Sequence, residues 1–323
     1  YSEMCFPTSH SQFKGAIKLG FPIGREILSQ ADVVLMIGKM ATSYYMFSEP
    51  MMDFAGPNTK FVHIDNNAAH VGSTHPTAVG IVGDPKTSLA VLGTALDATM
   101  SGSDKEAVNG RLTVFAEEKK ASDEAYQSRL KEDWDLRPMT PYRMMAEVAS
   151  ALPSNTIVVN DAVTTSDALY DSLQFDDPGT IYGGRGGALG WGIGGAMGVK
   201  LANPDRPVVA VLGDGSAMMT VQGLWTAATF NIPVVYVICN NASYRVLKLN
   251  MNIYKDHILK GHSADSRYMG MDFPQGLDIA GMAEAMGVHG CRIEDPSAMA
   301  PALKHAMELG KPAVLDVVID GSV

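Results

Sequence analysis

Two short apolar runs, Val208 to Leu212 and Val234 to Cys239, constrain the fold of this chain more than any other feature. Each run has the length and the β-branched content of a buried strand. Between them, Thr220 to Phe230 has a helix-like pattern with Leu224 and Trp225 on one face. The stretch therefore predicts a strand–helix–strand unit, and the right-handed crossover makes its two strands parallel.

Oxygen-bearing side chains follow both runs. Asp214 comes directly after the first run, and Asn241 comes directly after the second. Because parallel strands end at the same edge of a sheet, we expect Asp214 and Asn241 to face each other there. Carboxylate and amide oxygens suit Mg²⁺, which takes six oxygen ligands and shares them between protein, phosphate and water. The backbone carbonyl of Ser243 is the most plausible third protein ligand.

The residues around Asp214 fit a phosphate. Gly213 and Gly215 let the backbone approach a ligand closely, and the amides near Ser216 would point at it. Taken alone, Gly-Asp-Gly is usually a turn, and Asn-Asn usually ends a strand. Their joint placement at the ends of two strands in one crossover unit favours a metal–diphosphate site.

The segment GDGSAMMTVQGLWTAATFNIPVVYVICNNASY resembles the diphosphate and metal motif of thiamine-diphosphate (ThDP) enzymes, in particular the group of benzoylformate decarboxylase and acetolactate synthase. The likeness runs through most of residues 139–323 and, more weakly, through the part before. It implies a ThDP- and Mg²⁺-dependent enzyme that acts on 2-oxo acids, first of all a non-oxidative decarboxylase. An acetolactate-synthase-type carboligase is the alternative, and a non-catalytic Mg²⁺–nucleotide-binding module is a second one.

The resemblance also implies roles for cofactor contacts. Thr164 would bind the diphosphate, although N-capping of the following helix explains the hydroxyls of its segment equally well. In the glycine-dense segment 183–192, Gly187 would contact the aminopyrimidine ring through its backbone, and Leu189 would wedge between the two rings of the cofactor. Tyr244 would bind phosphate through its hydroxyl, or else pack in the core.

Substrate and proton-transfer positions follow from the same resemblance. Val246, Leu247 and Asn250 match positions that line the substrate pocket in the family. The benzoylformate enzymes have an aromatic residue where this chain has Asn250, which argues against an aryl substrate. His10, in Phe-Pro-Thr-Ser-His, resembles a histidine that faces the cofactor and transfers protons, a role that suits its ordinary pKa of about 6.5. As a lone histidine it is otherwise an exposed loop residue.

The length of 323 residues predicts two domains. Strands alternating with helices favour an α/β fold in both, each a doubly wound parallel-sheet domain. We expect a middle domain over residues 1–98, truncated at its first strand, and the diphosphate-binding domain over 139–323. Residues 99–138 would link them, with a polar stretch from Thr99 to Gly110 and a solvated connecting helix from Arg111 to Asp133.

Composition limits the partners and the compartment. The net charge of −10 argues against nucleic acid and against an anionic membrane. We find no membrane span and no signal peptide. Three cysteines without paired spacing suit a reducing compartment, so we expect a cytoplasmic protein. The chain starts at Tyr1 without an initiator methionine, and we expect it to be a fragment of a longer polypeptide.

The resemblance implies one further partner. In these enzymes a glutamate of an N-terminal pyrimidine-binding domain activates the cofactor, usually across a dimer interface, and nothing in this sequence matches that domain. We therefore expect a homodimer or homotetramer, and a chain that holds only the metal–diphosphate half of the site. The middle domain carries a flavin such as FAD in some relatives, but residues 1–98 contain no G-x-G-x-x-G motif that would indicate one.

Overall fold

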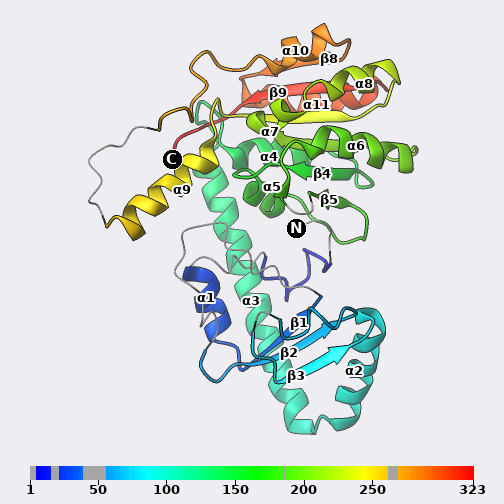
Figure 1. The fold of residues 1–323 in the computed structure, drawn as a ribbon, viewed down its shortest axis with the longest axis vertical. Helices are drawn as coiled ribbons and strands as arrows, with labels where there is room; N and C mark the ends of the chain where they lie inside the picture. The colour runs from blue at the N-terminus through cyan, green and yellow to red at the C-terminus, as the bar shows by residue number, and fades with distance from the viewer. Residues whose placement is uncertain (1–4, 16–21, 39–55, 74, 185–186, 261–267) are drawn as a thin grey trace. The chain divides into compact units, whose positions relative to one another are not determined.

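A computed structural model describes residues 5–15, 22–38, 56–73, 75–184, 187–260 and 268–323. The chain forms two compact units, one of Lys14–Glu118 and one of Tyr1–Phe13 with Lys119–Val323. Each unit contains a parallel sheet with flanking helices (Figure 1). The predicted α/β fold is therefore confirmed. The first four residues of the predicted middle domain lie outside the described residues.

The unit Lys14–Glu118 has a three-stranded parallel sheet in the order β1-β2-β3. The strands are β1 Val33–Ile37, β2 Lys60–Asp65 and β3 Val79–Val82. The helices of this unit include α1 Pro22–Ser29 and α2 Pro85–Thr99. Asp84 caps α2 by accepting a hydrogen bond from the amide of Thr87 at 2.9 Å. Proline at the first helical position needs no such partner, which explains the sharp start of this helix.

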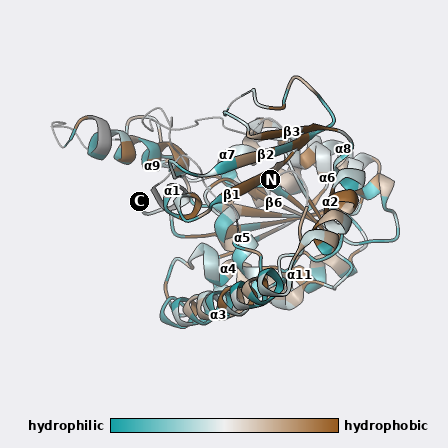
Figure 2. Cartoon of the chain, turned by 90° about the horizontal axis from the view of Figure 1, so that it is seen from below, coloured by the Kyte–Doolittle hydropathy of each residue, from teal (hydrophilic) through white to brown (hydrophobic). Residues whose placement is uncertain are grey.

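Helix α3, Gly102–Glu132, occupies most of the predicted linker. The connecting helix predicted from Arg111 to Asp133 is therefore present, but it begins nine residues earlier, at Gly102, inside the polar stretch that follows α2. Asp104 supports this start by accepting hydrogen bonds from the amide and hydroxyl of Ser101. No residue of α3 is buried, and teal and brown alternate along it in Figure 2, as expected of the predicted solvated helix.

The larger unit has a six-stranded, all-parallel sheet in the order β5-β4-β6-β7-β9-β8. The strands are β4 Ile157–Asp161, β5 Ile181–Gly183, β6 Val208–Gly213, β7 Val235–Asn240, β8 His289–Ile293 and β9 Ala313–Val318. The strand–helix–strand unit at the centre of the sequence analysis is thus confirmed as β6 and β7, which pair in parallel.

Helices cover both faces of this sheet (Figure 1). One face packs against α4 Pro141–Ala151, α5 Ser166–Ser172 and α11 Met299–Glu308, and the other against α6 Trp191–Ala202, α7 Asp214–Met219, α8 Gly223–Thr229 and α10 Ile279–Ala285. Side chains of β6 alternate between these two cores, with Val209 and Val211 in the first and Val208, Ala210 and Leu212 in the second. A strand buried on both faces needs the continuous apolar sequence that the run Val208 to Leu212 provides.

The strand order reverses between β4 and β6. The chain passes from β4 to its neighbour β5, returns to β6 on the other side of β4, and then continues outward to β7. In open α/β sheets such a reversal leaves a crevice at the carboxyl ends of the strands, where ligands bind. Asp161 pairs with Leu212, and Gly213 pairs with Cys239, so all three strands end at the same level.

The helix predicted from Thr220 to Phe230 is corrected by the structure. Helix α7 begins at Asp214, directly after β6, and α8 follows after a short break. Leu224 is 1% exposed, but Trp225, predicted on the same face, is 59% exposed. The difference arises because α8 packs on the sheet through Leu224 and Ala228, which turns Trp225 toward the outside of this unit.

Replacing these two neighbours separately tests this packing. Leu224→Ala removes a buried side chain and leaves a cavity, so we expect the free energy of unfolding to fall by about 2–5 kcal/mol. Trp225→Ala is the control and should change it by about 0.5 kcal/mol or less in a monomeric chain. Urea unfolding followed by circular dichroism measures both, and equal losses would contradict the assigned face.

Candidate functional site

A cavity lies at the carboxyl edge of the larger sheet. It is lined by the segments that follow β4, β6 and β7, together with Leu189 and the start of helix α9, Arg245–Ile253. Most of the residues predicted to form the site line this cavity: Thr164, Leu189, Gly213, Asp214, Gly215, Ser216, Asn241, Ser243, Tyr244 and Val246. Asp214 and Asn241, 27 residues apart in the sequence by the difference of their numbers, therefore share one cavity as predicted.

Asp214 has one carboxylate oxygen without a partner in the part of the chain that the structure describes. The side chain is 3% exposed, and its Oδ1 accepts a hydrogen bond from the amide of Gly215 at 2.7 Å. Its Oδ2 is buried and has no hydrogen-bond partner among the described residues. Burial raises the pKa of Asp214 to about 6, against the opposing influence of nearby backbone amides, that of Gly215 first. A buried oxygen in this state is costly unless a ligand satisfies it, so the atom fits a cation.

The turn after β7 supplies the other predicted metal ligands. The Oδ1 of Asn241 accepts hydrogen bonds from the amide of Ser243 at 3.0 Å and from its hydroxyl at 3.2 Å. Between them, Ala242 has a φ of 53°, in the left-handed region. An amide oxygen has two lone pairs, and the hydroxyl of Ser243 can rotate away. Asn241 is therefore able to offer one lone pair to a cation while the amide of Ser243 keeps the other.

The donor set fits a hard cation held in part by its ligand. In the part of the chain that the structure describes, no three His, Cys, Asp or Glu side chains gather as a closed metal site. The cavity instead offers one carboxylate, one amide oxygen and backbone carbonyls. Mg²⁺ accepts such a partial set and completes its shell with phosphate oxygens and water.

Asp161, at the end of β4, is a buried residue of the cavity that was not predicted from the sequence. Its Oδ2 accepts hydrogen bonds from the hydroxyl of Ser216 at 2.6 Å and from the amides of Gly190 and Gly192, each at 3.0 Å. Burial raises its pKa, and these hydrogen bonds oppose the rise. The hydroxyl of Ser216 is thereby engaged, so the residue is left with its backbone amide for a phosphate. Its position at a strand end was the available signal.

Tyr244 and Gly215 are in close contact. A Cβ added to Gly215 would lie 2.7 Å from the tyrosine ring, so glycine is required for this approach. The ring also meets that of Phe273 edge to face, with centroids 4.8 Å apart. Tyr244 thus packs as the structural interpretation predicted, and it lines the cavity at the same time.

Arg245 is a second cavity residue that was not predicted from the sequence. It is the first residue of α9 and the one cation among the described residues that line the cavity. Its Nε donates a hydrogen bond to the carbonyl of Ser322 at 2.8 Å. A guanidinium in the cavity suits an anionic ligand. No pattern in the sequence marked this residue, because its role depends on contact with the far end of the chain.

Four predicted residues do not line the cavity. Leu247 is 44% exposed and Asn250 lies on the same helix, with its Oδ1 buried and unpartnered among the described residues. Gly187 is exposed with a φ of 72°, next to Arg185 and Gly186, which lie outside the described residues. His10 is exposed, and its Nδ1 accepts a hydrogen bond from the amide of Gln12 at 3.1 Å. The roles given to these residues stay predictions.

The fold and the cavity together define an α/β protein whose cavity, at the point where its strand order reverses, is lined by carboxylate and amide oxygens and a guanidinium. A family model described as thiamine pyrophosphate enzyme, C-terminal TPP binding domain, matches residues 147–317, and that of the central domain of the same enzymes matches residues 2–92. The chain belongs to the thiamine pyrophosphate enzyme family.

Individual relatives agree with this assignment. The chain is 26% identical over 316 residues to benzoylformate decarboxylase of Pseudomonas aeruginosa, covering 98% of this chain and 54% of the relative. It is 28% identical over 330 residues to a probable acetolactate synthase large subunit of Methanococcus aeolicus, covering 98% and 52%. The chain therefore spans about half the length of these relatives.

Solved structures show the same fold. A ThDP-dependent 4-hydroxybenzoylformate decarboxylase of Rhodococcus jostii RHA1 matches with a TM-score of 0.76 at 24% identity, covering 99% of this chain and 55% of that one. Within the described residues, no helix is long and apolar enough to cross a membrane.

A pair of glycine substitutions tests the contact at Tyr244. Gly215→Ala would push a methyl group into the tyrosine ring, and we expect the free energy of unfolding to fall by about 1–3 kcal/mol. Gly213→Ala is the matched control, because a Cβ there meets nothing within 4 Å. It should change the free energy of unfolding by about 0.5 kcal/mol or less, and a larger loss of stability than that of Gly215→Ala would contradict the geometry.

The pKa of Asp214 predicts a pH dependence of stability. Its folded-state pKa of about 6 lies above the ordinary 3.8, so the folded chain binds the proton more tightly than the unfolded chain does. Well below the unfolded-state pKa of 3.8 the carboxyl group is neutral in both states and has no such cost. The cost grows as the pH rises between the two pKa values, and above about pH 6 most of the cost of roughly 2–3 kcal/mol is present.

Asp214→Asn removes this cost. In Mg²⁺-free buffer, we expect the stability of the variant relative to the original chain to increase as the pH rises from about 4 to about 7. Urea unfolding at a series of pH values measures the difference. A difference that stays constant over this range would show that Asp214 does not titrate as its burial implies.

Proposed function

We propose that this chain forms the metal–diphosphate half of a ThDP- and Mg²⁺-dependent enzyme that acts on 2-oxo acids by non-oxidative decarboxylation. The observation that carries the proposal is the buried Oδ2 of Asp214, which has no partner among the described residues and shares one cavity with Asn241 and Ser243. Membership of the family does not by itself show that a chain keeps the metal ligands. The Oδ2 of Asp214, unpartnered among the described residues, supports the view that this chain keeps them.

The residues of the cavity divide the work of binding. Asp214, the side chain of Asn241 and the backbone carbonyl of Ser243 would hold the cation. The cation and the guanidinium of Arg245 would offset the charge of the diphosphate, in a cavity that also contains the carboxylate of Asp161. The absence of side-chain bulk at Gly213 and Gly215 leaves room for the phosphate next to the backbone, and Thr164 and Tyr244 would add hydroxyl donors.

Other residues would set the rings and the substrate. Leu189 is an exposed apolar side chain at the cavity and would support the two rings of the cofactor. Bound ThDP supplies an electron sink for the electrons released when CO₂ leaves. Val246, with Leu247 and Asn250 further along α9, would contact the substrate. His10 would move a proton if the complete enzyme brings it to the cofactor.

The complete enzyme would need a carboxylate from a further domain. The relatives are about twice as long as this chain, which supports a pyrimidine-binding domain that provides the activating glutamate within a homodimer or homotetramer. We place this assembly in the cytoplasm. In an assay of 2-oxo acid decarboxylation, residues 1–323 should show no turnover by themselves. Ordinary turnover would contradict the division of the site.

Carboligation is the second candidate reaction. The identity to a probable acetolactate synthase subunit, 28%, is as high as that to the decarboxylase, 26%. Both reactions would share the same cation and diphosphate contacts. They differ in whether the fragment that remains after loss of CO₂ is released as an aldehyde or is transferred to a second 2-oxo acid. Analysis of the products that the complete enzyme forms from pyruvate separates acetaldehyde, which indicates a decarboxylase, from acetolactate, which indicates a carboligase.

Calorimetry tests the cofactor and the metal together. We expect the chain to bind ThDP in the presence of Mg²⁺ and to lose most of its affinity without the metal. Asp214→Ala should abolish the Mg²⁺-dependent binding, because it removes the cavity carboxylate whose Oδ2 has no partner among the described residues. Asp205→Ala, at an exposed position, is the control. Unchanged affinity of Asp214→Ala would refute the ligand assignment, and tighter binding of Mg²⁺–ADP than of Mg²⁺–ThDP would favour a nucleotide-binding module.

A further inference from the structure

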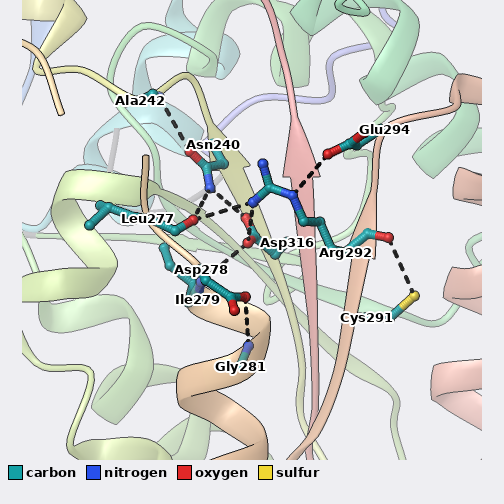
Figure 3. A network of polar contacts seen from close by, with 10 residues as sticks. All are labelled: Asn240, Ala242, Leu277, Asp278, Ile279, Gly281, Cys291, Arg292, Glu294 and Asp316. Carbon is teal, nitrogen blue, oxygen red and sulfur yellow. Dashed lines mark hydrogen bonds and ion pairs between the residues drawn. The ribbon is translucent and has the colours of Figure 1, made fainter. Parts of the chain in front are cut away.

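A buried polar network lies beside the turn that carries Asn241 and Ser243 (Figure 3). Its centre is Asp316 on β9, a carboxylate that is 0% exposed in an otherwise apolar strand. Its Oδ1 accepts a hydrogen bond from Nδ2 of Asn240 at 2.7 Å. Its Oδ2 accepts hydrogen bonds from the guanidinium of Arg292 at 3.1 Å and from the amide of Ile279 at 3.2 Å.

The sheet register places these groups together. Asp316 pairs with Arg292 of β8 on one side and with Ile238 of β7 on the other. Asn240 comes two residues after Ile238, so its side chain lies on the same face of the sheet as Asp316. Figure 3 shows the three side chains converging from three neighbouring strands. The network is therefore built into the strand pairing.

Asn240 connects this network to the turn. Its Nδ2 also donates to the carbonyl of Leu277 at 2.9 Å, and its Oδ1 accepts from the amide of Ala242 at 3.2 Å. The two donor contacts fix the amide group with its oxygen toward Ala242. A flipped amide would place two acceptors, those of Asp316 and Leu277, against its oxygen. Asp316 and the carbonyl of Leu277 thus together determine which end of Asn240 faces the turn.

The turn needs such support because it is strained. Ala242 is a residue with a side chain in the left-handed region, at a φ of 53°, which costs roughly 1 kcal/mol or more. Besides the bond to Asn240, the carbonyl of Ala242 accepts from the amide of Phe273 at 2.9 Å, and the amide of Tyr244 donates to the carbonyl of Met271 at 2.8 Å. Strained backbone persists where surrounding contacts over-determine it.

Stability alone is a weak reason for this network. Burying a carboxylate costs several kcal/mol before its partners compensate, and well-packed apolar residues often replace a buried ion pair without loss. The neighbours Leu315 and Val317 are both apolar and 0% exposed. What an apolar residue at position 316 would not provide is an oriented acceptor for Asn240.

We infer that Asp316 is a positioning residue for the candidate metal site. It holds Asn240, Asn240 holds the amide of Ala242, and the fixed turn presents Asn241 and Ser243 to the cavity. The inference rests on the proposed function for its ligand, but the mechanical part of it, the control of the 241–243 turn by Asp316, does not.

The test compares Asp316→Asn with Leu315→Ala. Asparagine keeps the shape of the side chain but replaces one acceptor oxygen with an NH₂ group. In one orientation this group would face the donors of Arg292 and Ile279; in the other it would face Nδ2 of Asn240, which would then lack its acceptor at position 316. We expect Asp316→Asn to weaken Mg²⁺-dependent binding of ThDP and of inorganic pyrophosphate at least tenfold, measured by calorimetry. Leu315→Ala destabilises the same strand on its other face and should change these affinities by less than about threefold.

Hydrogen exchange measured by NMR gives a readout that needs no ligand. Asp316→Asn should increase the exchange rates of the amides of Ala242 and Ser243 at least tenfold more than those of β6, whereas Leu315→Ala should show no such selectivity. If Asp316→Asn does not fold, Arg292→Gln loosens the same carboxylate from a partly exposed side and should give the same selective pattern with a smaller amplitude.

The outcomes separate the two hypotheses. Failure of the original chain to bind Mg²⁺–ThDP would overturn the proposed function, while the exchange rates would still decide whether Asp316 controls the turn. Normal binding by the original chain together with equal affinity and unselective exchange in Asp316→Asn and Arg292→Gln would overturn the inference. Equal losses of affinity in Asp316→Asn and Leu315→Ala would likewise overturn it, because they would show that Asp316 acts only through the stability of its strand.

Discussion

Parallel pairing of β4, β6 and β7 is the constraint on which the candidate site depends. Because the three strands are in register, Asp161, Gly213 and Asn240 end them at one level, and the segments that follow all open into one cavity. The reversal of strand order between β4 and β6 keeps crossover helices away from that edge. The apolar cores on both faces hold the strands in this register, and the polar residues beyond the strand ends are brought together as a consequence.

Three buried carboxylates of the larger unit meet the cost of burial in different ways. Asp161 and Asp316 each receive three hydrogen-bond donors and so act as fixed acceptors that tie separate segments together. Asp214 receives one donor on Oδ1, and its Oδ2 has no described partner. The contrast matters because all three are nearly excluded from solvent. Two of them complete the protein's own framework, and the third is the one that the proposed function assigns to a cation.

The strands of the larger sheet and the residues directly after them could be predicted from the sequence, because short-range patterns of apolar and polar residues determine them. The run Val208 to Leu212 reads as a strand because both of its faces are apolar, and Asp214 and Asn241 stand out because they follow such runs. The split between α7 and α8 and the exposure of Trp225 depend on how the helices meet the sheet, which a period of 3.6 does not specify. The tasks of Asp161 and Asp316 were hidden, since their partners lie up to 55 and 76 residues away. In Asn-Asn the sequence drew attention to the second residue, while the first is the one bound into the buried network.

The engagement of the Ser216 hydroxyl by Asp161 has an evolutionary consequence. Because that hydroxyl is hydrogen-bonded within the protein, the segment from Gly213 to Ser216 can contact a phosphate chiefly through main-chain groups. Exchanging one amino acid for another leaves main-chain groups in place as long as the fold survives. Such contacts therefore tolerate substitutions in the sequence. In the proposed enzyme, new substrate preferences would arise through side chains of α9 while the main-chain contacts to the cofactor stay unchanged.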